Sequence, residues 1–66
     1  MTYDVLKMRR SDQTVTGFIV ENKSHDAADG AKFAAQLLHG PKGIYRHWVV
    51  PHGTYAVGDT YRGDGE

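Results

Sequence analysis

The chain contains no cysteine, and with 66 residues it has little core volume with which to compensate. A domain of this size buries only about 60% of the surface that its unfolded chain exposes. Disulfides and thiolate-bound zinc, which stabilise many small domains, are excluded, and so is a cysteine nucleophile. Stability must therefore come from side-chain packing or from a partner.

Segments 2–10 and 14–22 are rich in β-branched, aromatic and aliphatic residues and flank the polar cluster Ser-Asp-Gln, a pattern typical of a β-hairpin. Gly17 lies inside the second segment, where glycine indicates a bulge or a close backbone approach. Residues 25–39 then predict a helix. Ser24 suits its N-cap, and Gly40 followed by a proline suits its end.

Segments 44–50 and 54–61 return to strand composition and are separated by a Pro-His-Gly turn. We therefore expect a single α+β domain over residues 1–61 in the order β-β-α-β-β. Its one helix would pack on a three- or four-stranded antiparallel sheet. Residues 62–66 lack an apolar anchor and are expected to form a disordered tail.

The expected strands carry more apolar side chains than one helix can cover. Because strand residues alternate between the two faces of a sheet, Tyr45, His47 and Val49 should point away from Trp48. In the second strand, Phe18 and Val20 should share one face, and Val15 and Ile19 the other. We therefore expect a second layer from another copy of the chain, or an apolar patch for a different partner.

The expected helix has a similar excess. Phe33 and Leu37 lie beside a stripe of mostly small apolar residues: Ala27, Ala28, Ala31, Ala34, Ala35 and Leu38. The polar positions, His25, Asp29, Lys32, Gln36 and His39, occupy a narrow arc opposite. More of the helix is apolar than one sheet face requires.

Eight basic residues balance eight acidic ones, which is not the charge pattern of a duplex-binding protein. Single-stranded nucleic acid stays open as an alternative, because bases stack on strand aromatics while cations follow the backbone. Tyr45 and His47 would supply such a platform with Lys42 and Arg46, and with Lys7, Arg9 and Arg10 if the first strand lies close.

Enzyme activity is not expected, because neither serine lies in a nucleophile motif and a chain this small has little room for a pocket. We expect no cofactor, since phosphate-binding glycine motifs do not occur. We also expect no metal, because His47, His52 and Asp59 are poorly spaced to share an ion. No apolar run exceeds three residues, so no membrane span is expected. The N-terminal residues lack the order of a secretory signal, which favours an intracellular, cytoplasmic protein.

The sequence thus favours a small non-enzymatic module that binds another protein and forms a homo-oligomer. An inhibitor or adaptor of a larger protein or complex, such as a viral inhibitor of a host assembly, fits this size. Aromatic and aliphatic residues that lack cover in the expected fold form the predicted contact surface. These residues are Tyr45, His47, Val49, Tyr55, Phe33 and Leu37.

Overall fold

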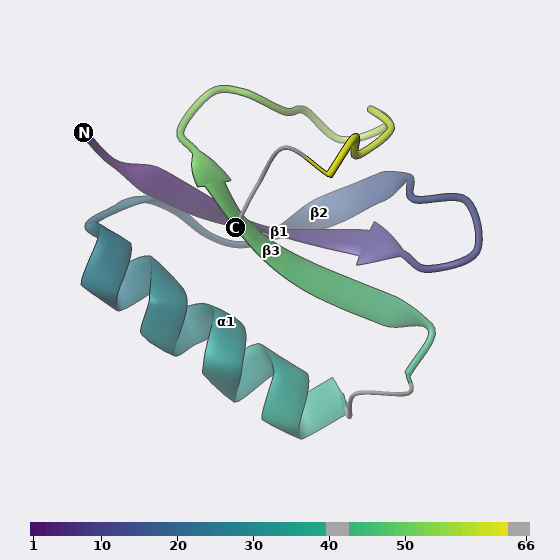
Figure 1. Cartoon of the computed structure of the whole chain (residues 1–66), viewed down its shortest axis with the longest axis horizontal. Coiled ribbons are helices and arrows are strands. Elements are labelled where there is room, and N and C mark those ends of the chain that lie inside the picture. Colours follow the sequence, from purple (N-terminus) through teal and green to yellow (C-terminus); the bar gives the residue numbers. More distant parts are fainter. Residues whose placement is uncertain (40–42, 64–66) are drawn as a thin grey trace.

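The computed structural model describes residues 1–39 and 43–63. Three strands and one helix follow in the order β1 (Tyr3–Arg9), β2 (Val15–Lys23), α1 (His25–His39) and β3 (Tyr45–Pro51). The strands form one antiparallel sheet in the order β2-β1-β3, and α1 lies along one face of it (Figure 1). The predicted α+β fold, with one helix on an antiparallel sheet, is confirmed.

The fourth strand predicted over residues 54–61 is wrong. This segment makes a single bridge, Thr14 to Thr60, and is otherwise a turn and irregular chain. Asp59 explains the interruption, because its carboxylate accepts a hydrogen bond from the Ala56 amide (2.8 Å) and its own amide donates to the Ala56 carbonyl (3.0 Å). Gly58 adopts φ +96° in this turn, a backbone conformation that no regular strand contains.

The hairpin of β1 and β2 contains the bulge that Gly17 indicated. The pairing shifts register between the Lys7–Gly17 and Met8–Val15 pairs, and twice more toward the start of β1. These shifts place Val20 opposite Val5, and Phe18 opposite Leu6. Phe18 and Val20 consequently lie on opposite faces of the sheet, contrary to the prediction, because an inserted residue reverses the alternation.

The helix begins as predicted. Ser24 Oγ accepts a hydrogen bond from the Ala27 amide (3.3 Å), and the Ser24 carbonyl accepts one from the Ala28 amide (2.9 Å). Gly40 and Pro41, which were predicted to end the helix, lie outside the described residues. Among the side chains of residues 25–38 of α1, two alanines seven positions apart are buried, Ala28 and Ala35.

Small side chains let the helix lie close to the sheet. Ala28 is fully buried against Val5 of β1 and Val49 of β3, with Val20 and Ala31 at the margin of this cluster. Ala34 and Leu38, which were predicted to belong to the packed stripe, are exposed instead. The sheet-facing positions are thus filled by alanine, and the larger apolar residues of α1 remain outside.

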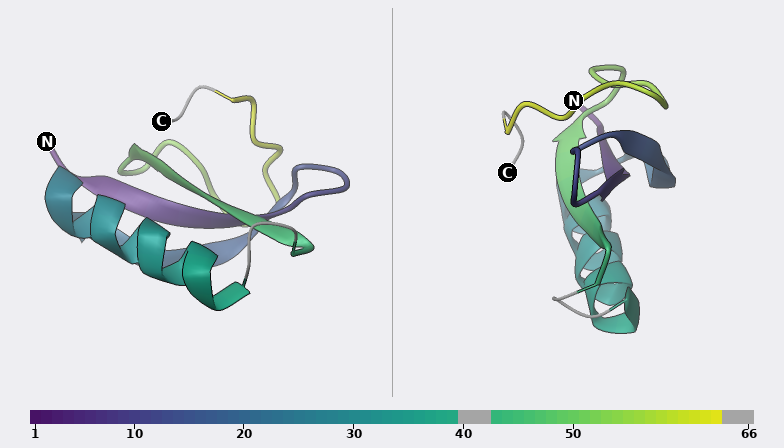
Figure 2. Two further views of the ribbon diagram at one scale, coloured as in Figure 1. Left: turned by 60° about the horizontal axis from the view of Figure 1, so that its bottom comes forward. Right: turned by 90° about the vertical axis from the view of Figure 1, so that its right-hand side faces the viewer.

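The second face of the sheet is covered by the chain's own C-terminal segment. Leu6 and Met8 of β1 form a second core cluster with Val15, Val50 and Tyr61. The Tyr61 ring stacks on Trp48, with centroids 5.6 Å apart and planes 12° apart. Figure 2 shows residues 52–63 on the side of the sheet opposite the helix. The prediction that another molecule supplies the second layer is therefore wrong for this face.

Within the described part of the predicted tail, the Arg62 amide donates a 3.4 Å hydrogen bond to the Tyr55 hydroxyl. Residues 64–66 of the predicted tail lie outside the described part of the chain. In the described ranges, no helix combines the length and apolarity that a bilayer span requires.

Candidate functional site

Three of the predicted contact residues lie on one face of β3. Tyr45, His47 and Val49 do point away from Trp48, as alternation predicts, but this is the face that α1 covers. His47 is 1% and Val49 2% exposed, and Tyr45 is half-buried. The helix therefore supplies the cover that these side chains were thought to lack, and His47 and Val49 are not presented at the surface.

Tyr55 belongs to the cover of the second face. It is half-buried, packs against the Leu6 cluster, and its ring centroid lies 5.5 Å from that of Tyr61. Its hydroxyl accepts the Arg62 amide hydrogen bond described above. These contacts indicate a structural role, with the ring bridging core and surface.

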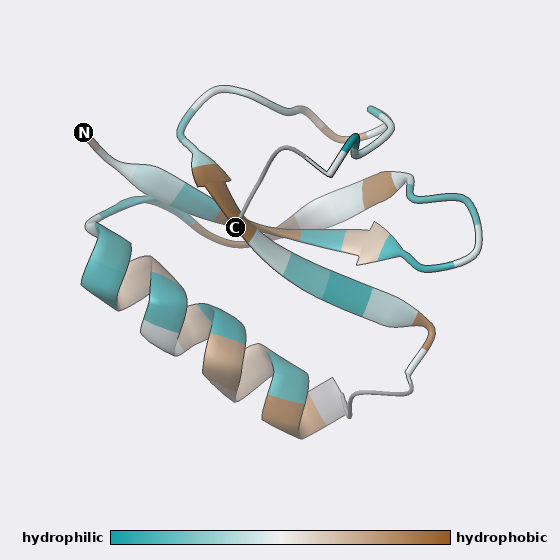
Figure 3. Cartoon of the chain, viewed as in Figure 1, coloured by the Kyte–Doolittle hydropathy of each residue, from teal (hydrophilic) through white to brown (hydrophobic). Residues whose placement is uncertain are grey.

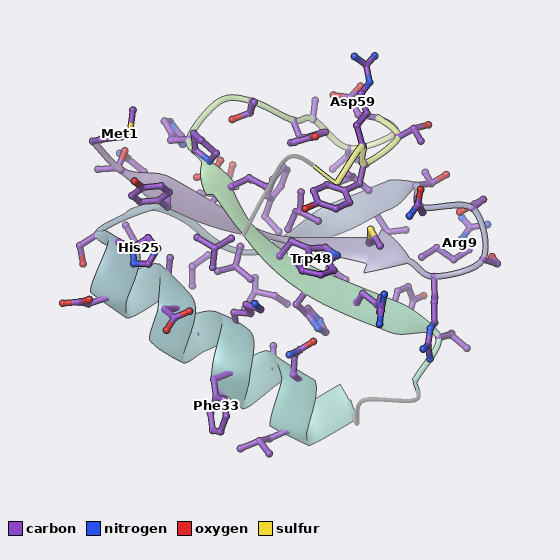
Figure 4. The ribbon with its side chains drawn as sticks, viewed as in Figure 1. Met1, Arg9, His25, Phe33, Trp48 and Asp59 are labelled. Carbon is purple, nitrogen blue, oxygen red and sulfur yellow. The ribbon has the colours of Figure 1, made fainter. Side chains whose placement is uncertain are left out.

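The remaining two predicted residues, Phe33 and Leu37, are 66% and 69% exposed. Leu38, which the sequence pattern assigned to the packed stripe, is 82% exposed and joins them. Figure 3 shows the apolar positions in the second half of α1, and Figure 4 shows Phe33 pointing away from the sheet. We call Phe33, Leu37 and Leu38 the outer helix surface.

A second candidate site lies where β1 ends beside the start of β3. The register pairs Arg9 with Tyr45, Met8 with Arg46 and Lys7 with His47. The Arg10 amide donates to the Ile44 carbonyl (2.8 Å), which extends the pairing to the hairpin turn. The first strand is thus close to the third, the condition on which the nucleic-acid alternative depended. Lys42, which that alternative also named, lies outside the described residues.

The geometry of this site combines aromatic rings and cations. The Lys7 ammonium lies 4.2 Å from the centroid of the Tyr45 ring. A pocket of about 520 Å³ opens beside them, lined by Arg9, Arg10, Ser11, Gly43, Ile44 and Tyr45. We call Lys7, Arg9, Arg10, Tyr45 and Arg46 the basic–aromatic cluster.

A smaller hollow of about 300 Å³ lies further along β3, lined by Lys32, Gln36, Arg46 and Trp48. The Lys32 ammonium is 5.3 Å and the Arg46 guanidinium carbon 5.9 Å from the Trp48 ring centroid. Arg46 thus contributes to the cluster and to this hollow. Lys32 is half-buried, and its ammonium lies within cation–π distance of the ring.

A buried carboxylate that the sequence reasoning missed lies at the other end of β1. Asp4 is 2% exposed and accepts hydrogen bonds from His52 Nδ1 (2.7 Å), the Asn22 amide (2.7 Å) and the Gly53 amide (3.3 Å). Burial raises the pKa of Asp4, but the hydrogen bonds from His52, Asn22 and Gly53 outweigh burial, so the pKa lies below its ordinary value. The carboxylate is therefore ionised, and His52 Nδ1 must carry a proton to donate to it.

Asp4 links three parts of the chain: β1, the end of β2 and the turn after β3. Asn22 adopts φ +58°, an uncommon conformation for a residue other than glycine, while its amide reaches the carboxylate. The sequence signal was a lone acidic residue within the apolar run of the first strand. His52, which the sequence predicted to be an ordinary turn histidine, donates a hydrogen bond to this carboxylate.

The candidate metal ligands do not converge. His47 is buried on the helix face, His52 is bound to Asp4, and Asp59 caps the turn at Ala56. Residues 1–39 and 43–63 contain no group of three or more His, Asp or Glu side chains arranged to hold a metal ion.

The chain matches no protein-family model, no curated protein and no solved structure. The outer helix surface and the basic–aromatic cluster are the two candidate functional sites that the geometry provides.

Proposed function

We propose that the protein is a small non-enzymatic protein-binding module, an inhibitor or adaptor, that docks its outer helix surface into an apolar groove of another protein. The observation that supports this is the exposure of Phe33, Leu37 and Leu38, from 66% to 82%, on a helix whose inner side is already packed with alanine. A domain with so small a core gains nothing in stability from leaving three large apolar side chains in water.

The arrangement suits recognition of a helix by a groove. Phe33 and Leu37 are four residues apart, so they lie one above the other on the same face and can act as paired anchors. Gly30 and Ala34 are exposed beside them and present little bulk, which allows a partner backbone to approach closely. An aromatic and two leucines of this kind are sufficient for the centre of a standard interface.

The charge at the N-terminal half of α1 indicates what kind of groove would accept the helix. Asp26 and Asp29 are exposed there, one turn or more before Phe33. A groove that receives the outer helix surface would be complementary if its rim were basic at that end. A second copy of this chain is the competing occupant, although the bare sheet face that first favoured a homo-oligomer is covered.

The test compares capture of proteins from the native cell extract by four forms of the full chain. These are the wild type, Phe33→Asp, Leu37→Asp and Val57→Asp, each assayed with and without nuclease. Val57 is 64% exposed on the C-terminal segment and serves as the matched control. A photo-crosslinking residue at position 38 identifies which captured protein touches the helix.

We expect one crosslinked protein whose capture persists after nuclease treatment. Either helix variant should reduce its capture by about 30-fold or more, and the control variant should capture it as well as the wild type does. Equal capture by all four forms would refute the proposal. Sedimentation at several concentrations tests the second copy: a dimer abolished by Phe33→Asp would replace the external partner with self-association.

A further inference from the structure

The basic–aromatic cluster lies where β1 ends beside the start of β3. It contains none of Phe33, Leu37 and Leu38, so it is not needed for the proposed protein contact. We propose that this end of the sheet is a second binding site, which takes single-stranded nucleic acid. The base of one nucleotide would occupy the pocket beside Tyr45, and the adjoining phosphates would lie along Arg10 and Arg46. This inference stands independently of the proposed protein partner.

The distribution of charge around residues 44–48 favours an anionic ligand. The net charge of the chain is zero, but five of its eight basic residues gather around residues 44–48. These are Lys7, Arg9, Arg10, Lys32 and Arg46. One acidic residue joins them, since Asp12 pairs with Arg9 at 3.5 Å, and both side chains are about half exposed. The fold therefore creates a locally positive surface, which the zero net charge of the chain does not indicate.

The size and lining of the larger pocket favour a nucleotide unit. At about 520 Å³ it far exceeds the volume of a bare phosphate, and it lies within the range of small-ligand sites. Arg9 and Arg10 line it together with Tyr45 and the exposed Ile44. A ligand with a planar, partly apolar ring and a nearby anion matches this lining. A nucleotide unit has that chemistry.

The two aromatic residues along β3 favour a nucleic-acid strand over a free nucleotide. A second cation-flanked aromatic, Trp48, lies three residues beyond Tyr45, or about 10 Å along β3. Arg46 lies between them in the strand and lines the hollow at Trp48. Tyr45 and Trp48 point to opposite faces of the sheet, and both can meet one ligand only along the edge of β3. That edge is open, because β3 pairs with β1 alone.

The experiment measures fluorescence anisotropy of a labelled single-stranded oligonucleotide of about ten residues, a length within the range bound by small single-strand modules. A duplex of the same sequence and a nucleoside monophosphate serve as competitors. We expect the single strand to bind at low salt, with log affinity falling against log salt at a slope of about −2 if three phosphates are neutralised.

Four variants locate the site. Tyr45→Ala should weaken binding by about 5- to 150-fold through lost stacking, whereas Tyr45→Phe should retain affinity to within about 3-fold. Arg10→Ala should reduce the salt slope by about 0.7. Lys23→Ala, which removes an exposed cation at the far end of β2, is the matched control and should leave the slope unchanged.

Tyr45 is half-buried, so circular dichroism must show that its variants fold; if Tyr45→Ala does not, exposed Arg10 decides the question. Four results would overturn the proposal: no binding at low salt, equal losses with Arg10→Ala and Lys23→Ala, duplex binding as tight as single-strand binding, or a monophosphate that competes as well as the strand. Phe33→Asp should leave oligonucleotide affinity unchanged, which separates this site from the proposed protein contact.

Discussion

Replacing Asp4 by alanine tests whether one buried carboxylate stabilises the end of the sheet at which β1, the end of β2 and the turn after β3 meet. Asp4 accepts two short hydrogen bonds, from His52 Nδ1 and the Asn22 amide, both 2.7 Å, and a longer one from the Gly53 amide. Alanine removes all three acceptor contacts. His52 is about half exposed and can turn to water, but the Asn22 amide loses its acceptor in a part-buried position.

The expected loss is a large part of the total stability. A hydrogen bond to a charged group contributes about 1.5–3 kcal/mol, and a buried donor left without an acceptor costs about 1–3 kcal/mol. Allowing for rehydration of His52, we expect Asp4→Ala to lower the free energy of unfolding by about 3 kcal/mol. A 66-residue domain has roughly 3–10 kcal/mol in total. The variant should therefore be marginally folded or unfolded.

Urea denaturation followed by Trp48 fluorescence measures this loss. With a slope of about 1 kcal/mol per molar urea for so small a domain, the midpoint should fall by about 3 M. Thr16→Ala is a control that removes a part-buried hydrogen bond from the Thr16 hydroxyl to a backbone carbonyl in the same hairpin. It should cost about 1 kcal/mol. A loss below 1 kcal/mol for Asp4→Ala at neutral pH would refute the reasoning.

The pH dependence has a definite sign. Because the pKa of Asp4 is lowered by folding, its contribution is complete above the unfolded pKa of about 3.9. The contribution is lost as pH falls through the lower folded value. Asp4→Asn should therefore flatten the decline in stability between pH 5 and pH 3. A residual decline is expected, since the Thr14 amide that donates to Asp12 lowers the pKa of Asp12 as well. An unchanged decline in Asp4→Asn would contradict the assignment.

The remaining predictions concern the C-terminal cover and the glycines. Tyr61→Ala should destabilise the domain by about 3–5 kcal/mol, because it leaves a cavity over Leu6 and uncovers the ring of Trp48. A Trp48 fluorescence maximum that does not shift to the red would contradict the stacking. Gly30→Ala should raise the free energy of unfolding by about 0.5–1 kcal/mol. Gly30 lies in α1, and apart from its chain neighbours and the adjacent helix backbone no described atom lies within 4 Å of the added methyl group. Gly53 has equally open space around an added methyl group but adopts φ +81°, so Gly53→Ala should lower the free energy of unfolding by about 1–2 kcal/mol. Calorimetry that gives both glycine variants a stability change of the same sign would refute this account.

The sequence predicted the elements that depend on local chemistry. The hairpin, the Ser24 cap, the helix limits and the bulge near Gly17 follow from residue type and short-range spacing, and all were confirmed. The alternation of β3 about Trp48 was also predicted correctly. What spacing could not give was which face of β3 the helix covers, because either choice satisfies the same alternation.

The helix surface was predicted only in part: Phe33 and Leu37 are exposed as expected, but Leu38 of the predicted stripe is exposed as well. The stripe of alanine and leucine and the flank with Phe33 and Leu37 are equally apolar, so the hydrophobic pattern did not fix the boundary between them. The side of the helix that packs on the sheet is the one with Ala28 and Ala35, since small residues permit close approach. Leu38 was thereby placed with Phe33 and Leu37, and the exposed surface is larger than predicted. Asp4 was missed because its partners are two backbone amides and a histidine 48 positions away, which no local pattern reveals.

The failure of the fourth strand links the two candidate sites. Had residues 54–61 paired with β3, the edge beside Tyr45 and Arg46 would have been closed and the second face of the sheet left bare. Instead the turn at Ala56 and Asp59 carries the chain across that face, where Tyr61 stacks on Trp48. The same segment therefore removes the need for a partner at the sheet face and leaves the cation-rich edge of β3 unpaired. Exposed apolar surface then remains on the helix, and exposed backbone and charge remain at the β3 edge, which is why the two proposals name two different ligands.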